Sequence, residues 1–189
     1  SSIKYAGISP ELGLSETQQT LVLNSLRGQV KLQVDGQIKT GRDIVIMAML
    51  GAEEFGFATS ALIVLGCVMM RKCHMNTCPV GVATQDAELR KRFLGRSEYL
   101  VNFFTFLAEE VREHLAEMGF TKLDDIVGRT DLINRKSENK TEKHALLDFS
   151  KVLFRINNDA ALRHIINQDH GVDQVKDVAI IQAAKAAIE

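Results

Sequence analysis

The chain has 189 residues, of which 46% are hydrophobic and 25% are charged, the balance of a globular protein with a sizeable core. Its formal net charge of −1 gives no reason to expect a nucleic-acid partner, and the lack of a signal-peptide pattern or of about 18 consecutive apolar residues argues against a membrane protein. The sequence opens at Ser1 without a methionine and runs directly into patterned sequence, so we expect a piece of a longer polypeptide.

The first part of the chain is patterned as alternating helices and strands. A capping-box pattern at Ser15-Glu16-Thr17-Gln18 predicts a helix to about Arg27. Apolar residues alternate with polar ones over residues 30–34, which predicts a short strand. An apolar stretch over residues 42–50 predicts a second helix, and a short run over residues 55–57 predicts a second strand. A strand, a helix and a strand within about 30 residues are typical of α/β proteins with a parallel sheet or barrel.

A short loop containing glycine follows each predicted strand. The two loops are Asp35-Gly36-Gln37 and Gly56-Phe57-Ala58-Thr59. In TIM barrels, backbone N–H groups of the loops after strands 7 and 8 commonly hold a phosphate group. A glycine after a strand is also frequent in plain turns, so the loops alone leave both roles open.

A predicted buried helix over residues 59–70 leads into a loop that contains all the cysteines of the chain, in the pattern Cys67-x5-Cys73-x4-Cys78. Thiolates are the ligands of iron–sulfur clusters, and Pro79 gives the Cys-Pro ending found in bacterial ferredoxin loops. The pattern favours an iron–sulfur cluster with three protein ligands, in a reducing compartment such as the cytoplasm.

Other roles for the cysteines stay open at this point. His74 beside Cys73 would complete a zinc set of three cysteines and one histidine, although structural zinc loops favour cysteine pairs two to four residues apart. Unligated thiols suit Cys67, which ends an apolar run, better than Cys73 and Cys78, which lie among polar and basic residues. Three cysteines also do not distinguish a [3Fe-4S] cluster from a [4Fe-4S] cluster with one non-protein ligand.

The sequence after the cysteine loop is mainly helical in pattern. Residues 98–118 predict a strong amphipathic helix whose aromatic stripe we expect in the core. Thr121 and Asp124 predict the cap of a short helix to Val127, and the polar stretch 134–143 predicts a surface linker. Further helices are predicted over residues 146–154, 159–166 and 178–188.

The sequence from Val34 to Gln85, which holds both glycine loops and ends in CPVGVATQ, closely resembles the end of the FMN-binding barrel of the glutamate synthase large subunit. The flanking segments SSIKYAG, LGLSETQQTLVLN and VGRTDL match the same region, so the likeness spans residues 1 to about 133. The resemblance implies an α/β fold, with the last two strands of a (β/α)8 TIM barrel in residues 1–133. A mainly helical linker would follow in residues 134–189, leading toward the C-terminal domain of the family.

The resemblance also implies the cofactor ligands. A [3Fe-4S] cluster would be held by Cys67, Cys73 and Cys78. FMN would be bound at the end of the seventh strand by Asp35, Gly36 and Gln37, and at the end of the eighth by Gly56, Phe57, Ala58 and Thr59.

The family reaction gives these cofactors a role. In glutamate synthases, electrons pass through the cluster to FMN, which reduces the 2-iminoglutarate formed from 2-oxoglutarate and glutamine-derived ammonia to L-glutamate. The donor would be an electron-donating flavin subunit or ferredoxin, and this segment does not decide between them. Because the glutaminase domain and the first six barrel strands have no counterpart here, we expect the segment alone to be inactive. The other hypothesis is a non-catalytic metal-binding or electron-relay module that keeps the cysteine loop without a flavin.

Overall fold

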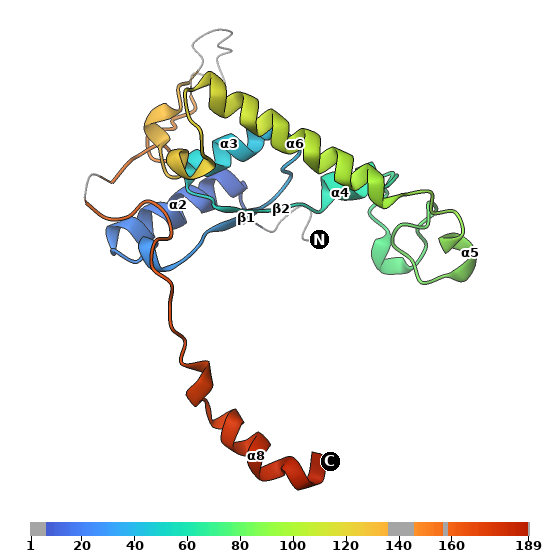
Figure 1. Ribbon diagram of the computed structural model, residues 1–189. Coiled ribbons are helices and arrows are strands. Elements are labelled where there is room, and N and C mark those ends of the chain that lie inside the picture. Colours follow the sequence, from blue (N-terminus) through green and yellow to red (C-terminus); the bar gives the residue numbers. More distant parts are fainter. Residues whose placement is uncertain (1–6, 136–145, 157–158, 189) are drawn as a thin grey trace.

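The computed structural model describes residues 7–135, 146–156 and 159–188 (Figure 1). In this part of the chain the helices are α2 (Pro10–Leu23), α3 (Gly41–Leu50), α4 (Thr59–Val64), α5 (Ala87–Arg90), α6 (Ser97–Glu117) and α8 (Lys176–Ile188). The strands are β1 (Gln33–Asp35) and β2 (Glu54–Gly56). Short 3₁₀ helices occupy Arg27–Gln29, Cys73–Met75, Leu123–Ile126, Thr130–Leu132 and Val172–Gln174.

β1, α3 and β2 form a βαβ unit. The two strands pair in parallel, with Val34 opposite Phe55 and Asp35 opposite Gly56. Parallel neighbours require a crossover connection, which α3 supplies. The α/β character predicted from the sequence is therefore confirmed for this segment, although β1 begins only at Gln33 and is shorter than the apolar alternation indicated.

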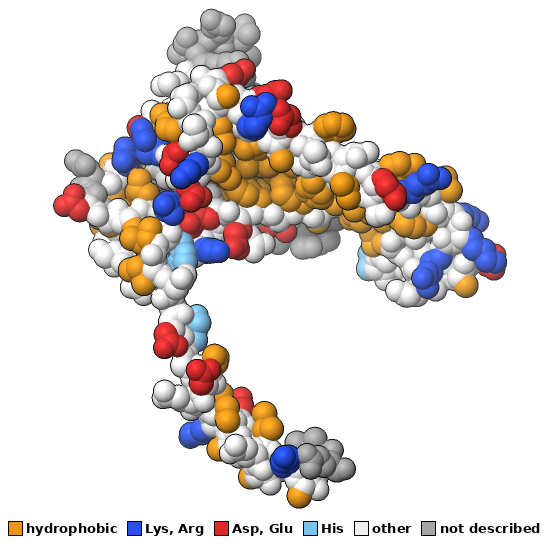
Figure 2. Space-filling model, in the orientation of Figure 1, with side chains coloured by type: hydrophobic (Ala, Val, Ile, Leu, Met, Phe, Trp, Pro, Cys, Tyr) orange, Lys and Arg blue, Asp and Glu red, His pale blue; other side chains and the backbone are white. Residues whose placement is uncertain are grey.

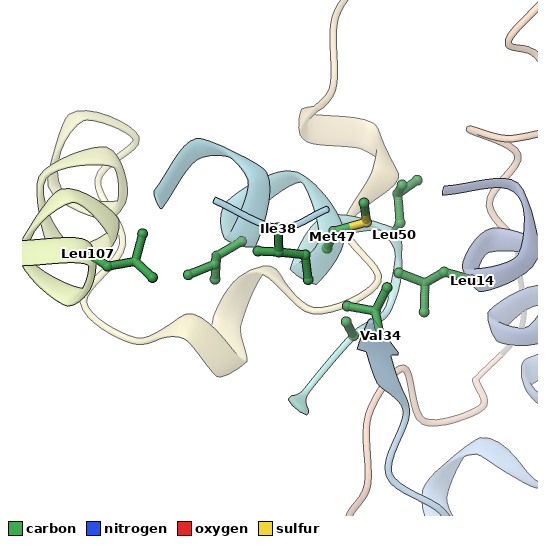
Figure 3. Packing of buried hydrophobic residues seen from close by; sticks show 8 residues of the cluster. Leu14, Val34, Ile38, Met47, Leu50 and Leu107 are labelled. Carbon is green, nitrogen blue, oxygen red and sulfur yellow. The ribbon is translucent and has the colours of Figure 1, made fainter. Parts of the chain in front are cut away.

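α3 lies at the centre of the core. It begins with a capping box in which the Asp43 N–H donates to Thr40 Oγ1 at 3.1 Å and the Thr40 N–H donates to the Asp43 carboxylate at 3.0 Å. Its apolar side chains pack against β1 and α2 on one side and against α6 on the other, and Figure 3 shows Met47, Leu50 and Val34 in this cluster.

α2 begins earlier than the sequence pattern indicated. Pro10 occupies the first turn, where its missing N–H is tolerated and its fixed φ suits a helix. The expected capping box at Ser15 is therefore wrong. Ser15 lies inside the helix, is buried, and donates its hydroxyl hydrogen to the carbonyl oxygen of Val152.

α6 matches the amphipathic helix predicted over residues 98–118. Leu107 and Leu115 are buried in its apolar face, and the aromatic stripe contributes the half-buried Phe103 and Phe104 to the core cluster. The Phe104 ring meets that of Phe57 edge to face, with the ring centres 5.2 Å apart. No helix among the described residues has both the length and the apolar character needed to cross a bilayer.

The helix expected over residues 59–70 is shorter than predicted. α4 ends at Val64, and Gly66 follows with a φ of +95°, a conformation that suits glycine and ends a helix. Ser60 is the buried residue of α4, and Ile63 is exposed, so the prediction of a buried helix is also wrong.

The C-terminal part departs most from the expected helices. Residues 146–156 and 159–168 contain turns and extended chain instead of the two helices predicted there. They lie against α2 and the 3₁₀ turn after it, where Gln19 Nε2 donates to the Lys151 carbonyl and the Ile165 N–H donates to the Gly28 carbonyl. These tertiary hydrogen bonds replace the helical ones that local propensity favours.

Two further helices were expected near the C-terminal part of the chain. The short helix expected before Val127 is a 3₁₀ turn over Leu123–Ile126. The last predicted helix is confirmed as α8, which extends away from the rest of the protein (Figure 1). The surface linker predicted over residues 134–143 lies almost entirely outside the described residues.

Candidate functional site

The three cysteines lie around one small cavity in the loop after α4. Cys67 is half-buried, Cys73 is exposed and Cys78 is buried, and all three are free thiols. The walls of the cavity are formed by the stretch from Cys67 to Cys73 and by residues 78–80. The structure therefore places the three cysteines, which are separated by five and four residues in the sequence, around one cavity.

The arrangement of donors bears on which metal group the loop suits. Within the described residues, no three His, Cys, Asp or Glu side chains form a group that could hold a metal ion. A structural zinc site uses four donors around one ion, whereas in an iron–sulfur cluster the thiolates bind different iron atoms. Cys67, Cys73 and Cys78, as free cysteines, supply the donor type that a cluster requires.

The backbone of the loop passes repeatedly through the left-handed region. The φ angles are +59° at Met69, +58° at Arg71 and +58° at Asn76, values that residues other than glycine rarely adopt. One of these turns directs the Met69 N–H to the sulfur of Cys67, at 3.4 Å. Uncommon backbone conformations of this kind persist where the surrounding contacts fix them, often at ligand sites.

Backbone N–H groups also surround the thiol of Cys78. The pKa of this thiol is lowered, first by hydrogen bonding from the N–H of Ala83 and further by those of Val80, Val82 and Gly81, against the opposing effect of burial. The loop therefore favours the thiolate form of Cys78, which is the form that binds metals.

Basic side chains are numerous around the cysteine loop. Arg71 and Lys72 are exposed within the loop itself, and Arg90, Lys91 and Arg92 are exposed at the end of α5. Figure 2 shows Lys and Arg side chains on the lobe that carries α5. Positive charges at this position would offset the negative charge of thiolate ligands.

The two glycine loops lie side by side at one edge of the sheet. Because β1 and β2 are parallel, the segments after Asp35 and Gly56 leave the same edge. At Gly56 an added Cβ would lie 3.0 Å from the Asp35 Cβ, so the Asp35 side chain lies close to the Gly56 backbone. Gly36 and Gln37 have φ angles of +144° and +60°. The residues predicted to bind FMN thus lie at the ends of the two strands, on the segments that follow them and at the start of α4.

The sequence analysis did not identify two polar networks. One joins Asn76 to Thr84 across the cysteine loop, and the other surrounds the fully buried Arg27, which pairs with Glu53 at 2.6 Å. Asn76 and Thr84 lie eight residues apart, and Arg27 and Glu53 lie 26 residues apart, so no local pattern indicates either pair.

Comparison with known proteins identifies the region to which the chain corresponds. Residues 1–121 match the family model described as the conserved region in glutamate synthase. The chain is 52% identical over 190 residues to the NADH glutamate synthase of Schizosaccharomyces pombe, and 50% identical over 190 residues to the large chain of the NADPH glutamate synthase of Bacillus subtilis. It is 54% identical over 153 residues to the chloroplastic ferredoxin-dependent glutamate synthase 2 of Arabidopsis thaliana.

These alignments cover most of the chain and a small part of each relative. They include 99%, 100% and 81% of the chain, in the same order, but only 9%, 12% and 9% of the three relatives. The chain thus corresponds to about a tenth of the length of these relatives.

Proposed function

The chain belongs to the glutamate synthase family, as a segment of the large subunit, and from this premise we propose that it supplies the cluster ligands and part of the flavin site of that oxidoreductase. The complete enzyme would form L-glutamate from 2-oxoglutarate and glutamine-derived ammonia. The observation that carries the proposal is the cavity shared by three thiols, at the end of a βαβ unit that matches the family.

The cluster ligands in this proposal are Cys67, Cys73 and Cys78. Three thiolates suit a [3Fe-4S] cluster, which would supply one-electron transfer when bound. The protein contributes an N–H group directed at Cys67, and the neighbouring Arg71 and Lys72 balance the thiolate charge. These features support a thiolate-ligated group, and the five- and four-residue gaps between the cysteines favour a cluster over a single zinc ion.

The flavin site in this proposal lies on the loops after the two strands. We assign β1 and β2 as the last two strands of a TIM barrel, in which such loops hold a phosphate group. The proposed FMN-binding residues are Asp35, Gly36, Gln37, Gly56, Phe57, Ala58 and Thr59. FMN would supply the hydride. Within the described residues, the buried hydroxyl of Ser60 has no hydrogen-bond partner, and it directly follows these loops, so it is available for a phosphate oxygen.

The proposal extends to domains and partners. Residues 1–133 would complete the barrel and carry the cysteine loop, and residues 134–189 would form a linker toward a further domain. The electron donor would be a flavin subunit or ferredoxin, because the names of the relatives include NADH, NADPH and ferredoxin. Free thiols suit a reducing compartment, the cytoplasm in our proposal, although the Arabidopsis relative is chloroplastic.

Iron and acid-labile sulfide analysis with low-temperature EPR, on protein purified without oxygen, tests the cluster. We expect about three irons per chain, with sulfide and an oxidised-state signal. Cys73→Ser should lose both. His74→Ala is the matched control, because it removes the histidine that a zinc site would use and should leave the cluster intact. Zinc without sulfide in the parent protein, with the zinc lost in both Cys73→Ser and His74→Ala, would refute the proposed cluster. Failure to bind FMN in the presence of the upstream strands would refute the flavin site and leave the electron-relay module.

A further inference from the structure

Residues 76–85 form a closed loop around Cys78, and Asn76 holds its two ends together. The side-chain Oδ1 of Asn76 accepts a hydrogen bond from the Gln85 N–H at 2.6 Å and lies 2.9 Å from the hydroxyl oxygen of Thr84. The same hydroxyl lies 2.9 Å from the carbonyl oxygen of Asn76 and accepts from the Asp86 N–H at 3.1 Å. We call this network the Asn76–Thr84 latch.

The backbone at Asn76 is matched to this role. Its φ of +58° and ψ of +23° place it in the left-handed region, which asparagine tolerates better than most residues. This turn reverses the chain between Cys73 and Cys78, while the Asn76 N–H donates to the Cys73 carbonyl at 3.2 Å. One residue thus fixes the turn between two proposed ligands and also closes the loop around the second.

The far side of the loop is fixed by α5. Asp86 caps this helix by accepting from the N–H groups of Glu88 and Leu89, both at 2.9 Å. The helix packs so closely on Gly81 that an added Cβ would lie 2.4 Å from the Leu89 carbonyl oxygen. Residues 80–83, which follow Cys78 in the loop, are therefore held between the latch and α5.

We propose that Asn76 and Thr84 are positioning residues for the iron–sulfur site, because the latch closes the loop that carries Cys78 and so fixes this ligand relative to Cys73. This inference rests on the proposed function. The potential of a cluster depends on the hydrogen bonds and the solvent exposure around its ligands. Opening the latch should therefore shift the potential.

Three variants separate the parts of the latch in the complete synthase large chain. Asn76→Gly keeps access to the left-handed backbone and removes the side-chain acceptor. Thr84→Val has nearly the shape of threonine without the hydroxyl, whereas Thr84→Ser keeps the hydroxyl. Asn24→Ala is the control, because the Asn24 amide also binds a backbone carbonyl, that of Thr20, on α2.

Two measurements decide the outcome. An EPR-monitored redox titration should give shifted potentials for Asn76→Gly and Thr84→Val, and parental values for Thr84→Ser and Asn24→Ala. Amide hydrogen exchange at residues 80–83 should be about tenfold faster in the first two variants, as expected for loss of one hydrogen bond. Loss of the cluster in those two variants with retention in Thr84→Ser would also support the latch.

Other results would overturn the inference. An intact cluster with an unchanged potential in Asn76→Gly and Thr84→Val would show that the latch does not act on the cluster, and unchanged exchange would show that it does not hold the loop. Absence of a cluster signal from the parent protein would refute the proposed function instead. The exchange rates, which need no cluster, would then still support or overturn the latch.

Discussion

Replacing the buried Arg27 by methionine should release the C-terminal segment from the body of the protein. The guanidinium is fully buried and donates to Gln18 Oε1, to the Val30 and Gly51 carbonyls and to Glu53 Oε2, at 2.5–2.9 Å. Methionine keeps an unbranched apolar stem of similar length, so Arg27→Met removes the hydrogen bonds with little loss of packing volume.

The size of the effect follows from what the variant leaves unpaired. The side chain of Glu53 is 13% exposed, and its other carboxylate oxygen accepts from the His164 N–H at 2.9 Å. Removing one partner of a buried ion pair costs about 3–5 kcal/mol. Because each 1.4 kcal/mol corresponds to about a tenfold change in an equilibrium constant, opening of this region should become more than about 100-fold more frequent.

Amide hydrogen exchange at His164 and Ile165 measures that opening. The Ile165 N–H donates to the carbonyl of Gly28, next to Arg27, so both amides report on the same contact. The control is Arg112→Met, whose guanidinium pairs with Glu109 on the exposed face of α6 and should leave the exchange unchanged. Exchange in Arg27→Met within about threefold of the parent would refute the argument that the buried pair holds this segment.

Three further results are expected. Gly81→Ala should lower the iron content, because the added Cβ would meet the backbone of α5. Gly66→Ala is the control: Gly66 also has a positive φ but has open space around it, so this variant should keep its iron. Equal iron loss in both variants would contradict this reasoning. Although burial raises the pKa of Asp43, hydrogen bonds from Lys39 and Thr40 lower it overall, so its stabilisation of α3 is complete above about pH 3.9 and is lost as the pH falls through the lower folded pKa. Asp43→Asn should therefore remove this part of the acid dependence in a circular dichroism titration, and an unchanged titration would count against it. Finally, residues 1–189 alone should form no glutamate, and detectable turnover would contradict the assignment as a partial site.

The elements with a strong local signal were predictable from the sequence. The period of α6 and the alternation before Asp35 each depend on residues close together in the chain. The start of α2 was missed because a capping-box pattern lay inside a helix that Pro10 begins earlier. The two helices expected in residues 146–166 were wrong because their backbone groups bind α2 and the turn after it, contacts of more than 100 residues in sequence separation that no local pattern encodes.

The early end of α4 bears directly on the proposed electron path. α4 has six residues and rises only about 9 Å, and Cys67 follows it after a short turn at Gly66. The cysteine loop therefore begins near the end of β2, where we place the flavin. A shorter path favours electron transfer between a cluster and a flavin. The glycine that ends the helix thus serves the proposed function by keeping the two sites near each other, at the expense of a buried helix that the apolar sequence alone would favour.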